Sequence, residues 1–277
     1  MTMRTPLITS TRLLDVSPAG RHAWHDLLGH VYADLGVEVE FVAHGWPTPI
    51  ADLWERDSLY GAFMCGWPFV RARLSGRAMQ PLVSVVPNWP EYEGKARYRS
   101  EFVVRADCDW QQLADAFGSR YGWMVEDSQS GWNAPRAALA GTTTPDHRTL
   151  FSASTGPHGN PRRTLAALID NEIDITALDG WYLDLLRVHE PELMSRVRTL
   201  AYTPWTPNPL LVASPDVGQE QVFALQSRLL SLHKNERYAP LLAAAHVKRF
   251  VDVDIAAYDE LEAMASKAVE LGYPAIR

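Results

Sequence analysis

The sequence predicts an α/β protein in which a middle segment is inserted between two outer segments. Short apolar strands alternate with amphipathic helices along 277 residues, and this alternation requires crossover connections between parallel strands. Composition changes near Arg105–Asp109 and again across the proline-rich stretch Thr203–Pro209. The two changes predict one lobe made of residues 1–104 and 206–277 and a second, inserted lobe of residues 105–205, with two chain crossings between them.

The first segment contains one long helix among short strands. Ser17 followed by Pro18 is typical of a helix start. Trp24 and later apolar residues recur at helical spacing until Gly36, a typical helix end. The predicted strands of this segment are Leu7–Val16, Val37–Val42, Ala62–Cys65, Leu82–Val86 and Phe102–Val104.

The remaining segments repeat the strand and helix pattern. Asp109 with Gln112 resembles a capping box and predicts a helix that ends near Gly118. The predicted strands are Tyr121–Val125, Thr149–Ala153, Ile173–Ala177 and Val197–Tyr202. The predicted helices are Asn133–Leu139, Arg162–Ile169, a helix capped by Asp179, Gln219–His233 and Ala256–Leu271.

Composition and motif absences exclude several classes of protein. The chain has 33 acidic and 26 basic residues, so a nucleic-acid partner is not expected. Two cysteines cannot build a disulfide scaffold. No zinc-type spacing, Gly-x-Ser-x-Gly elbow or Gly-x-Gly-x-x-Gly loop is present. We therefore expect no metal, no cofactor and no catalytic residue, and we favour binding over catalysis.

The sequence contains no stretch of about 18 uninterrupted apolar residues, so no membrane-spanning segment is expected. The first residues, Met1–Pro6, are not followed by the apolar region of a secretion signal. The localisation of the protein is left open by these residues.

The most informative polar segment is Asp127–Asn133, between a predicted strand and a predicted helix. Ser128, Ser130 and Gly131 lie at the helix start, where unpaired N–H groups and the positive end of the helix dipole attract anions. The segment therefore predicts an anion cradle. An ordinary helix cap with polar neighbours remains the alternative.

Three further positions have a functional and a structural interpretation. Trp67, in Gly-Trp-Pro, follows a buried strand. It is either a ligand-binding residue, because open α/β sheets bind ligands at the carboxyl ends of their strands, or a core side chain that follows a turn. His158 lies in a Gly-Pro-His-Gly loop and is either an oxyanion donor or an exposed histidine. Asp179 is either a helix cap or an acceptor for a ligand's amine.

The two predicted crossings contain further polar and aromatic side chains. Tyr98–Ser100 lies at the first crossing and Trp205–Asn208 at the second. Residues on such linkers can line a cleft between lobes, although prolines in linkers also serve only for stiffness.

Six segments occur in an order that resembles a known family. They are Phe63–Pro68, Tyr98–Val104, Val125–Asn133, Asp174–Asp179, Thr206–Leu210 and a closing helix that ends in Gly272–Pro274. In this order they resemble the phosphate/phosphite/phosphonate-type solute-binding proteins of ABC importers. The resemblance extends over essentially the whole chain, and its most specific part is the Ser-x-Ser-Gly segment.

The resemblance implies a type II periplasmic-binding fold: two α/β lobes, each a mixed sheet flanked by helices, joined by two hinge crossings around a ligand cleft. It also implies a location outside the cytoplasmic membrane and an ABC permease as partner. The implied ligand-binding residues are Trp67, Tyr98, Ser128, Gln129, Ser130, Trp132, His158, Asp179 and Asn208.

The resemblance assigns a role to each of these positions. Ser128, Gln129 and Ser130 would hold phosphonate or phosphate oxygens together with the loop histidine, and Asp179 would meet a ligand's amino group. Asn208 would be the polar residue of the second crossing. Trp67 and Tyr98 would be the first-lobe aromatics, and Trp67 or Trp132 could stack on a flat organic group.

Several positions depart from the family pattern, and the aromatic positions are bulkier. Gln129 stands where a second hydroxyl residue is common, and Asn208 stands where an aspartate can occur. The predicted function is a solute-binding protein that closes around a small anionic or related organic ligand. One alternative is a cytoplasmic enzyme on the same two-lobed fold that acts on a small organic anion or pyrimidine-like metabolite, with His158 and Asp179 as acid–base groups. Another is a sensor that signals its ligand to a partner protein.

Overall fold

The computed structural model describes residues 6–45 and 47–277, so most of the N-terminal stretch searched for a secretion signal lies outside this range. The chain forms two compact units. Unit 1 contains the chain up to Arg97 together with Pro207–Asp254, and unit 2 contains Tyr98–Thr206 together with Ile255–Arg277. The chain therefore passes between the units three times, at 97/98, 206/207 and 254/255.

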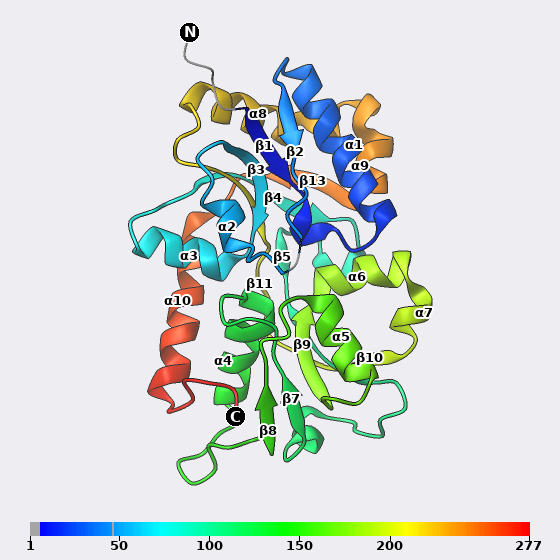
Figure 1. The fold of residues 1–277 in the computed structure, drawn as a ribbon, viewed down its shortest axis with the longest axis vertical. Coiled ribbons are helices and arrows are strands. Elements are labelled where there is room, and N and C mark those ends of the chain that lie inside the picture. The colour runs from blue at the N-terminus through cyan, green and yellow to red at the C-terminus, as the bar shows by residue number, and fades with distance from the viewer. Residues whose placement is uncertain (1–5, 46) are drawn as a thin grey trace. The chain divides into compact units, whose positions relative to one another are not determined.

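Unit 1 is built on a six-stranded mixed sheet in the order β13-β4-β12-β3-β1-β2 (Figure 1). β1 is parallel to β2 and β3, whereas β12 is antiparallel to both β3 and β4. The strands are β1 (Leu7–Ser10), β2 (Val39–Phe41), β3 (Leu59–Met64), β4 (Gln80–Pro87), β12 (Leu210–Ala213) and β13 (Val247–Val251).

The helices of unit 1 bury one face against this sheet. Ser17 caps α1 by accepting the Gly20 N–H at 2.9 Å, as the sequence predicts. The Trp24 ring on α1 packs edge-on against Phe63 of β3, with ring centroids 5.0 Å apart. The helices are α1 (Pro18–Asp34), α2 (Ala51–Trp54), α3 (Gly66–Leu74), α8 (Gln219–Ser231) and α9 (Ala239–Ala244).

Unit 2 contains a five-stranded mixed sheet in the order β10-β6-β9-β7-β8. β7 is parallel to both β8 and β9, β6 is antiparallel to β9, and β10 is antiparallel to β6. The strands are β6 (Ser100–Arg105), β7 (Arg120–Gly122), β8 (Ala153–Thr155), β9 (Ile175–Asp179) and β10 (Val197–Tyr202). A separate two-stranded sheet pairs β5 (Arg97–Tyr98) with β11 (Thr206–Pro207) and so contains the first two crossings.

Helices also flank the sheet of unit 2. The α-helices are α4 (Ala134–Ala140), α5 (Pro161–Ile169), α6 (Gly180–His189), α7 (Pro191–Met194) and α10 (Ile255–Glu270). A π-helical turn, η4 (Gln129–Asn133), runs directly into α4. One core cluster of unit 2 is built from strand residues, α4 and the C-terminal segment; among its members are Phe102, Tyr121, Ile175 and Ala268.

The last helix belongs to a different unit from the one that the sequence grouping suggests. That grouping placed residues 206–277 together, but Ile255–Arg277 belongs to unit 2. Figure 1 shows α10, in orange to red, alongside α4, in green. Ala268, Tyr273 and Ile276 are buried in the core cluster of unit 2. Their apolar surface therefore attaches this segment to unit 2.

Several predicted elements are shorter in the structure. The first strand ends at Ser10, where the Leu14 N–H donates to the Thr11 carbonyl and turns the chain. The helix predicted from Asp109 is only a 3₁₀ turn over Leu113–Ala116. Its capping box joins Gln112 to Asp115 instead of Asp109 to Gln112. In each case local side-chain and turn hydrogen bonds compete with the regular element. Among the described helices, none is long and apolar enough to span a membrane.

Candidate functional site

The predicted binding residues of unit 2 gather at one edge of its sheet. Since β7, β8 and β9 are parallel, their carboxyl ends lie at the same edge. The cradle follows β7, the His158 loop follows β8, and Asp179 ends β9. β6 runs in the opposite direction, with Ser100 opposite Asp179, so Tyr98 also precedes this edge. The carboxyl edge of a parallel sheet is where α/β folds place ligands.

The backbone of the cradle is held by the Ser128 side chain. Ser128 has an extended backbone, and its Oγ accepts the Gly131 N–H at 2.8 Å. A Cβ on Gly131 would lie 2.9 Å from Met124 Cβ and 3.1 Å from Ser128 Oγ, so glycine is required for this close approach. Ser128 is therefore a cap, as the alternative interpretation of the sequence holds, and it shapes a helix start whose other first-turn N–H groups lack helical partners.

Ser130 and Gln129 are adjacent but have different surroundings. Among the described residues, none forms a hydrogen bond with Ser130 Oγ, which leaves this hydroxyl available to a ligand. The Gln129 side chain is fully buried. Its Oε1 accepts from Asn133 Nδ2 at 3.0 Å, and its Nε2 lies 3.6 Å from Met264 Sδ on α10. The amide of Gln129 therefore packs against α10, which leaves only its backbone to contribute to the cradle.

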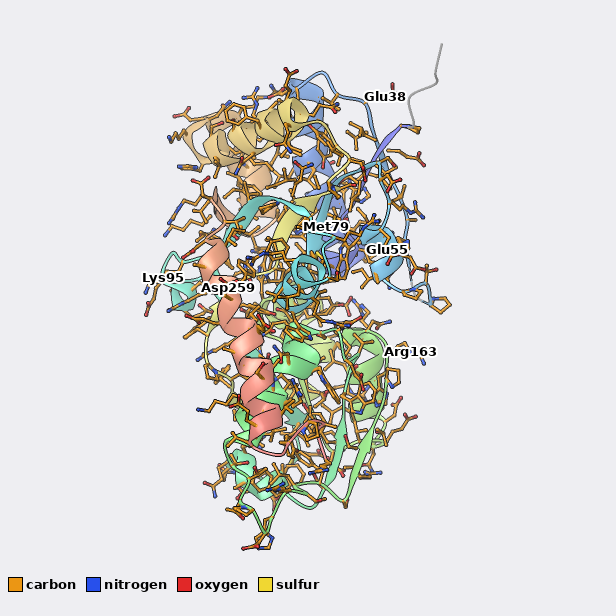
Figure 2. The ribbon with its side chains drawn as sticks, turned by 90° about the vertical axis from the view of Figure 1, so that its left-hand side faces the viewer. Glu38, Glu55, Met79, Lys95, Arg163 and Asp259 are labelled. Atoms are coloured by element: carbon orange, nitrogen blue, oxygen red, sulfur yellow. The ribbon has the colours of Figure 1, made fainter. Side chains whose placement is uncertain are left out.

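His158 lies in a loop that is anchored at both ends. Its backbone N–H donates to the Trp123 carbonyl at 3.1 Å, and its carbonyl accepts from Arg163 Nε at 3.1 Å. Arg163 is labelled in Figure 2 on the side of unit 2 away from α10. His158 Nε2 is buried and has no hydrogen-bond partner among the described residues. Burial lowers the pKa of His158, although the Glu172 carboxylate opposes this shift, so the imidazole is neutral near pH 7.

Trp132 packs into the protein interior. Its side chain is 7% exposed and belongs to the core cluster of unit 2. The Trp132 and Trp123 rings meet edge-on, with centroids 5.0 Å apart. In this arrangement Trp132 supports the wall of the cradle, and the partly buried Trp123 lies next to it.

Asp179 lies in an acidic environment. Its Oδ1 caps α6 by accepting the Tyr182 N–H at 3.0 Å. Burial raises the pKa of Asp179 to about 7; the N–H groups of Tyr182 and Trp181 oppose this shift, and the carboxylates Asp184 and Glu101 add to it. The carboxyl group is thus only partly ionised near neutral pH. A cationic group brought next to it would favour the ionised form.

Trp67 and Asn208 belong to unit 1, whereas the residues described above belong to unit 2. Trp67 is in the first turn of α3, directly after β3, and is partly exposed. Asn208 is buried just before β12, with its Nδ2 donating to the Val85 carbonyl at 3.1 Å. Tyr98 is fully buried at the first crossing, within unit 2. The structure therefore places seven of the nine predicted residues in unit 2 and two in unit 1.

Comparison with known families shows to which family the chain belongs. The sequence model for periplasmic substrate-binding proteins of phosphonate ABC transporters matches residues 15–258. The chain belongs to this family. The resemblance inferred from the six sequence segments is therefore confirmed. No curated protein matches the sequence.

Solved structures with the same fold support the predicted fold class. A binding protein component of an ABC phosphonate transporter from Pseudomonas aeruginosa is 16% identical, with a TM-score of 0.74 over 97% of each chain. PhnD1 from Prochlorococcus marinus in complex with methylphosphonate is 20% identical, with a TM-score of 0.73 over 95% of this chain and 98% of that one. A Xanthomonas citri protein bound to ATP is 15% identical, with a TM-score of 0.66 over 97% and 98%. The α/β, two-lobed periplasmic-binding fold is confirmed.

Two residues that hold the cradle in place, Asn133 and Arg136, are not among the binding residues predicted from the sequence. Asn133 is fully buried and Arg136 is 6% exposed, and both lie behind the cradle. In the sequence, Asn133 is notable only as the last residue of the polar segment Asp127–Asn133. The available signal was an arginine three residues after an asparagine in an otherwise apolar helix, a spacing that places both side chains on one helix face.

Proposed function

We propose that this protein binds a small phosphorus oxyanion, a phosphonate or phosphate, at the cradle of residues 128–131 and is the solute receptor of an ABC importer. The observation that carries this proposal is the shape of the cradle. A serine cap and a glycine whose Cβ would clash with its neighbours hold a helix start at the carboxyl edge of the sheet, and a serine hydroxyl without a hydrogen-bond partner among the described residues lies next to them. Backbone N–H groups with a hydroxyl suit phosphoryl oxygens.

His158 and Asp179 extend this proposal to the other groups of the ligand. The buried Nε2 of His158, when it carries the ring proton, would donate a hydrogen bond to a phosphoryl oxygen. Asp179 would accept hydrogen bonds from a ligand's ammonium group. The protein needs no bond-breaking step for this role. Closure of the two lobes around the ligand and delivery to a permease remain predictions from the family.

Isothermal titration calorimetry tests the proposal directly. The protein is first unfolded and refolded to remove carried-over ligand, and is then titrated with methylphosphonate, inorganic phosphate and an aminoalkyl phosphonate. We expect saturable one-to-one binding of at least one phosphorus oxyanion, and thermal stabilisation of about 2.7 kcal/mol at 100 times its Kd. Binding of none of these compounds, or turnover of a bound one, would contradict a receptor role.

The variant Ser130→Ala tests the uncommitted hydroxyl. We expect the affinity for methylphosphonate to fall about 10- to 100-fold, since one hydrogen bond to a charged group contributes about 1.5–3 kcal/mol. The free energy of unfolding should change by less than about 0.5 kcal/mol, because no described residue depends on this hydroxyl. Ser152→Ala removes another serine hydroxyl of unit 2, which donates only to the Ser119 carbonyl, and provides the control. Unchanged affinity in Ser130→Ala would exclude Ser130 from the site.

The raised pKa of Asp179 predicts opposite effects of pH on binding and on stability. Ionisation through about pH 7 should strengthen binding of an aminoalkyl phosphonate relative to methylphosphonate, because only the former has a cation for the carboxylate. Stability has the reverse sign: a carboxyl whose folded pKa exceeds its unfolded value favours folding at low pH, and this contribution is lost as pH rises through about 7.

The variant Asp179→Asn should therefore remove both effects. It keeps a side-chain oxygen to cap α6 and cannot ionise. We expect its free energy of unfolding at pH 8 to exceed that of the wild type by about 3–4 kcal/mol, with little difference at pH 4. The preference for the aminoalkyl ligand should no longer grow with pH. A wild-type preference that does not change between pH 6 and pH 8 would exclude Asp179 as the amine acceptor.

A further inference from the structure

The back of the cradle is fastened to the C-terminal helix by two amide side chains. Asn133 Nδ2 donates to Gln129 Oε1 and to the Leu261 carbonyl of α10, both at 3.0 Å. The Gln129 amide in turn contacts Met264 Sδ. The contacts with Leu261 and Met264 join residues more than 120 positions apart in sequence. In Figure 2 the upper part of α10 is marked by Asp259, and the helix runs down in front of unit 2.

Arg136 completes this connection from the first turn of α4. Its Nη2 donates to Asn133 Oδ1 and to the Ala265 carbonyl, both at 3.3 Å. Its Nη1 donates to the Pro274 carbonyl at 3.0 Å. One guanidinium therefore joins the cradle, α10 and the segment that follows α10.

The guanidinium is a buried positive charge without an ionic partner in the protein. Arg136 is 6% exposed. Among the described residues, no carboxylate lies within ion-pair distance of it. Its Nε is also buried, and it has no hydrogen-bond partner among the residues that the structure describes. Burial lowers the pKa of Arg136, with the more distant Glu126 opposing, although an arginine remains protonated in proteins.

The burial of the Arg136 charge lowers the stability of the ligand-free protein. A buried charge that has no counter-ion costs several kcal/mol in typical proteins. An uncharged side chain could form similar hydrogen bonds to the carbonyls without this cost. A negative ligand held at residues 128–131, one to two helical turns away, would offset it.

We propose that Arg136 is a positioning residue of the anion site, which fastens the cradle to α10 and supplies the positive charge behind the bound anion. This inference rests on the proposed function, because it requires an anion in the cradle. It assigns α10, the last helix of the chain, a part in ligand affinity. It also explains the glutamine at position 129, whose amide is committed to this connection.

The test compares Arg136→Gln, which keeps N–H donors but removes the charge, with Arg136→Lys, which keeps the charge. The control is Arg198→Gln, because Arg198 also donates to backbone carbonyls of unit 2, those of Cys108 and Trp110, away from the cradle. Circular dichroism confirms folding, and Arg136→Met replaces the glutamine variant if that one does not fold. Methylphosphonate is titrated by calorimetry below and above its second ionisation.

We expect Arg136→Gln to bind the dianion about tenfold more weakly than the wild type. The deficit should shrink several-fold for the monoanion, because a charge interaction scales with the ligand's charge. Arg136→Lys should recover most of the affinity, and Arg198→Gln should bind as the wild type does. A merely structural role of Arg136 would give the same deficit for both forms of the probe.

The outcomes distinguish this inference from the proposed function. A folded Arg136→Gln or Arg136→Met variant with wild-type affinity, or with a deficit that is independent of the probe's charge, overturns the inference alone. A wild-type protein that binds neither methylphosphonate nor inorganic phosphate overturns the proposed function, and the inference with it.

Discussion

The variant Gly131→Ala is expected to weaken methylphosphonate binding by about a hundredfold or more. A Cβ at this position would lie 2.9 Å from Met124 Cβ and 3.1 Å from the Ser128 Oγ that caps the turn. Neither atom is the end of a long side chain, so the cradle backbone has to move. Because each N–H group of the cradle depends on this backbone, all of its hydrogen bonds to an oxyanion weaken together.

Calorimetry with methylphosphonate measures this loss, and Gly141→Ala is the matched control. Gly141 follows α4, has a negative φ, and its Cβ would make only a 3.4 Å contact with the Ala138 carbonyl oxygen. We expect the control variant to bind as the wild type does. If Gly131→Ala is folded and retains the wild-type affinity, the ligand is not held by this cradle.

The variant Gly156→Ala is expected to lower the free energy of unfolding by about 2–3 kcal/mol. Its Cβ would lie 2.5 Å from Trp123 Cδ2 and 2.6 Å from the Trp123 backbone carbonyl oxygen. This carbonyl also accepts the N–H of His158. Displacing it should therefore loosen the His158 loop, and oxyanion affinity should fall along with stability.

Urea denaturation followed by tryptophan fluorescence measures the stability change. The control is Gly29→Ala on α1, where a Cβ would have no neighbour within 4 Å. That variant should gain about 0.5–1 kcal/mol, because alanine favours a helix more than glycine does. A Gly156→Ala protein as stable as the wild type would show that Trp123 can move away without cost, and that the loop is less tightly packed than the structure indicates.

Local signals made much of the fold predictable. The start of α1 at Ser17 and Pro18, the cap of α6 at Asp179 and the alternation of strands and helices along the chain all follow from residues within a few positions of one another. The position of the Ser-x-Ser-Gly segment between a strand and a helix is of the same kind. Such signals are readable because caps and periodicity act over one or two helical turns.

The binding residues were less predictable from the sequence than the fold, because the role of a side chain depends on which surface it faces. Gln129 and Ser130 are neighbours in one polar segment, but the Gln129 amide packs against Met264 and the Ser130 hydroxyl has no partner among the described residues. Trp132 has the residue type of a ligand-stacking side chain and packs in the core cluster. Spacing within a single turn cannot distinguish these directions.

The sequence by itself determined the fold class, the family and the position of the Ser-x-Ser-Gly segment between a strand and a helix, because each depends on short segments and their order. Only the tertiary structure decided the unit to which α10 belongs, the buried position of Arg136 behind the cradle, and the raised pKa of Asp179. These properties arise from burial and from contacts between residues far apart in the chain. Such contacts form only when the whole chain has folded.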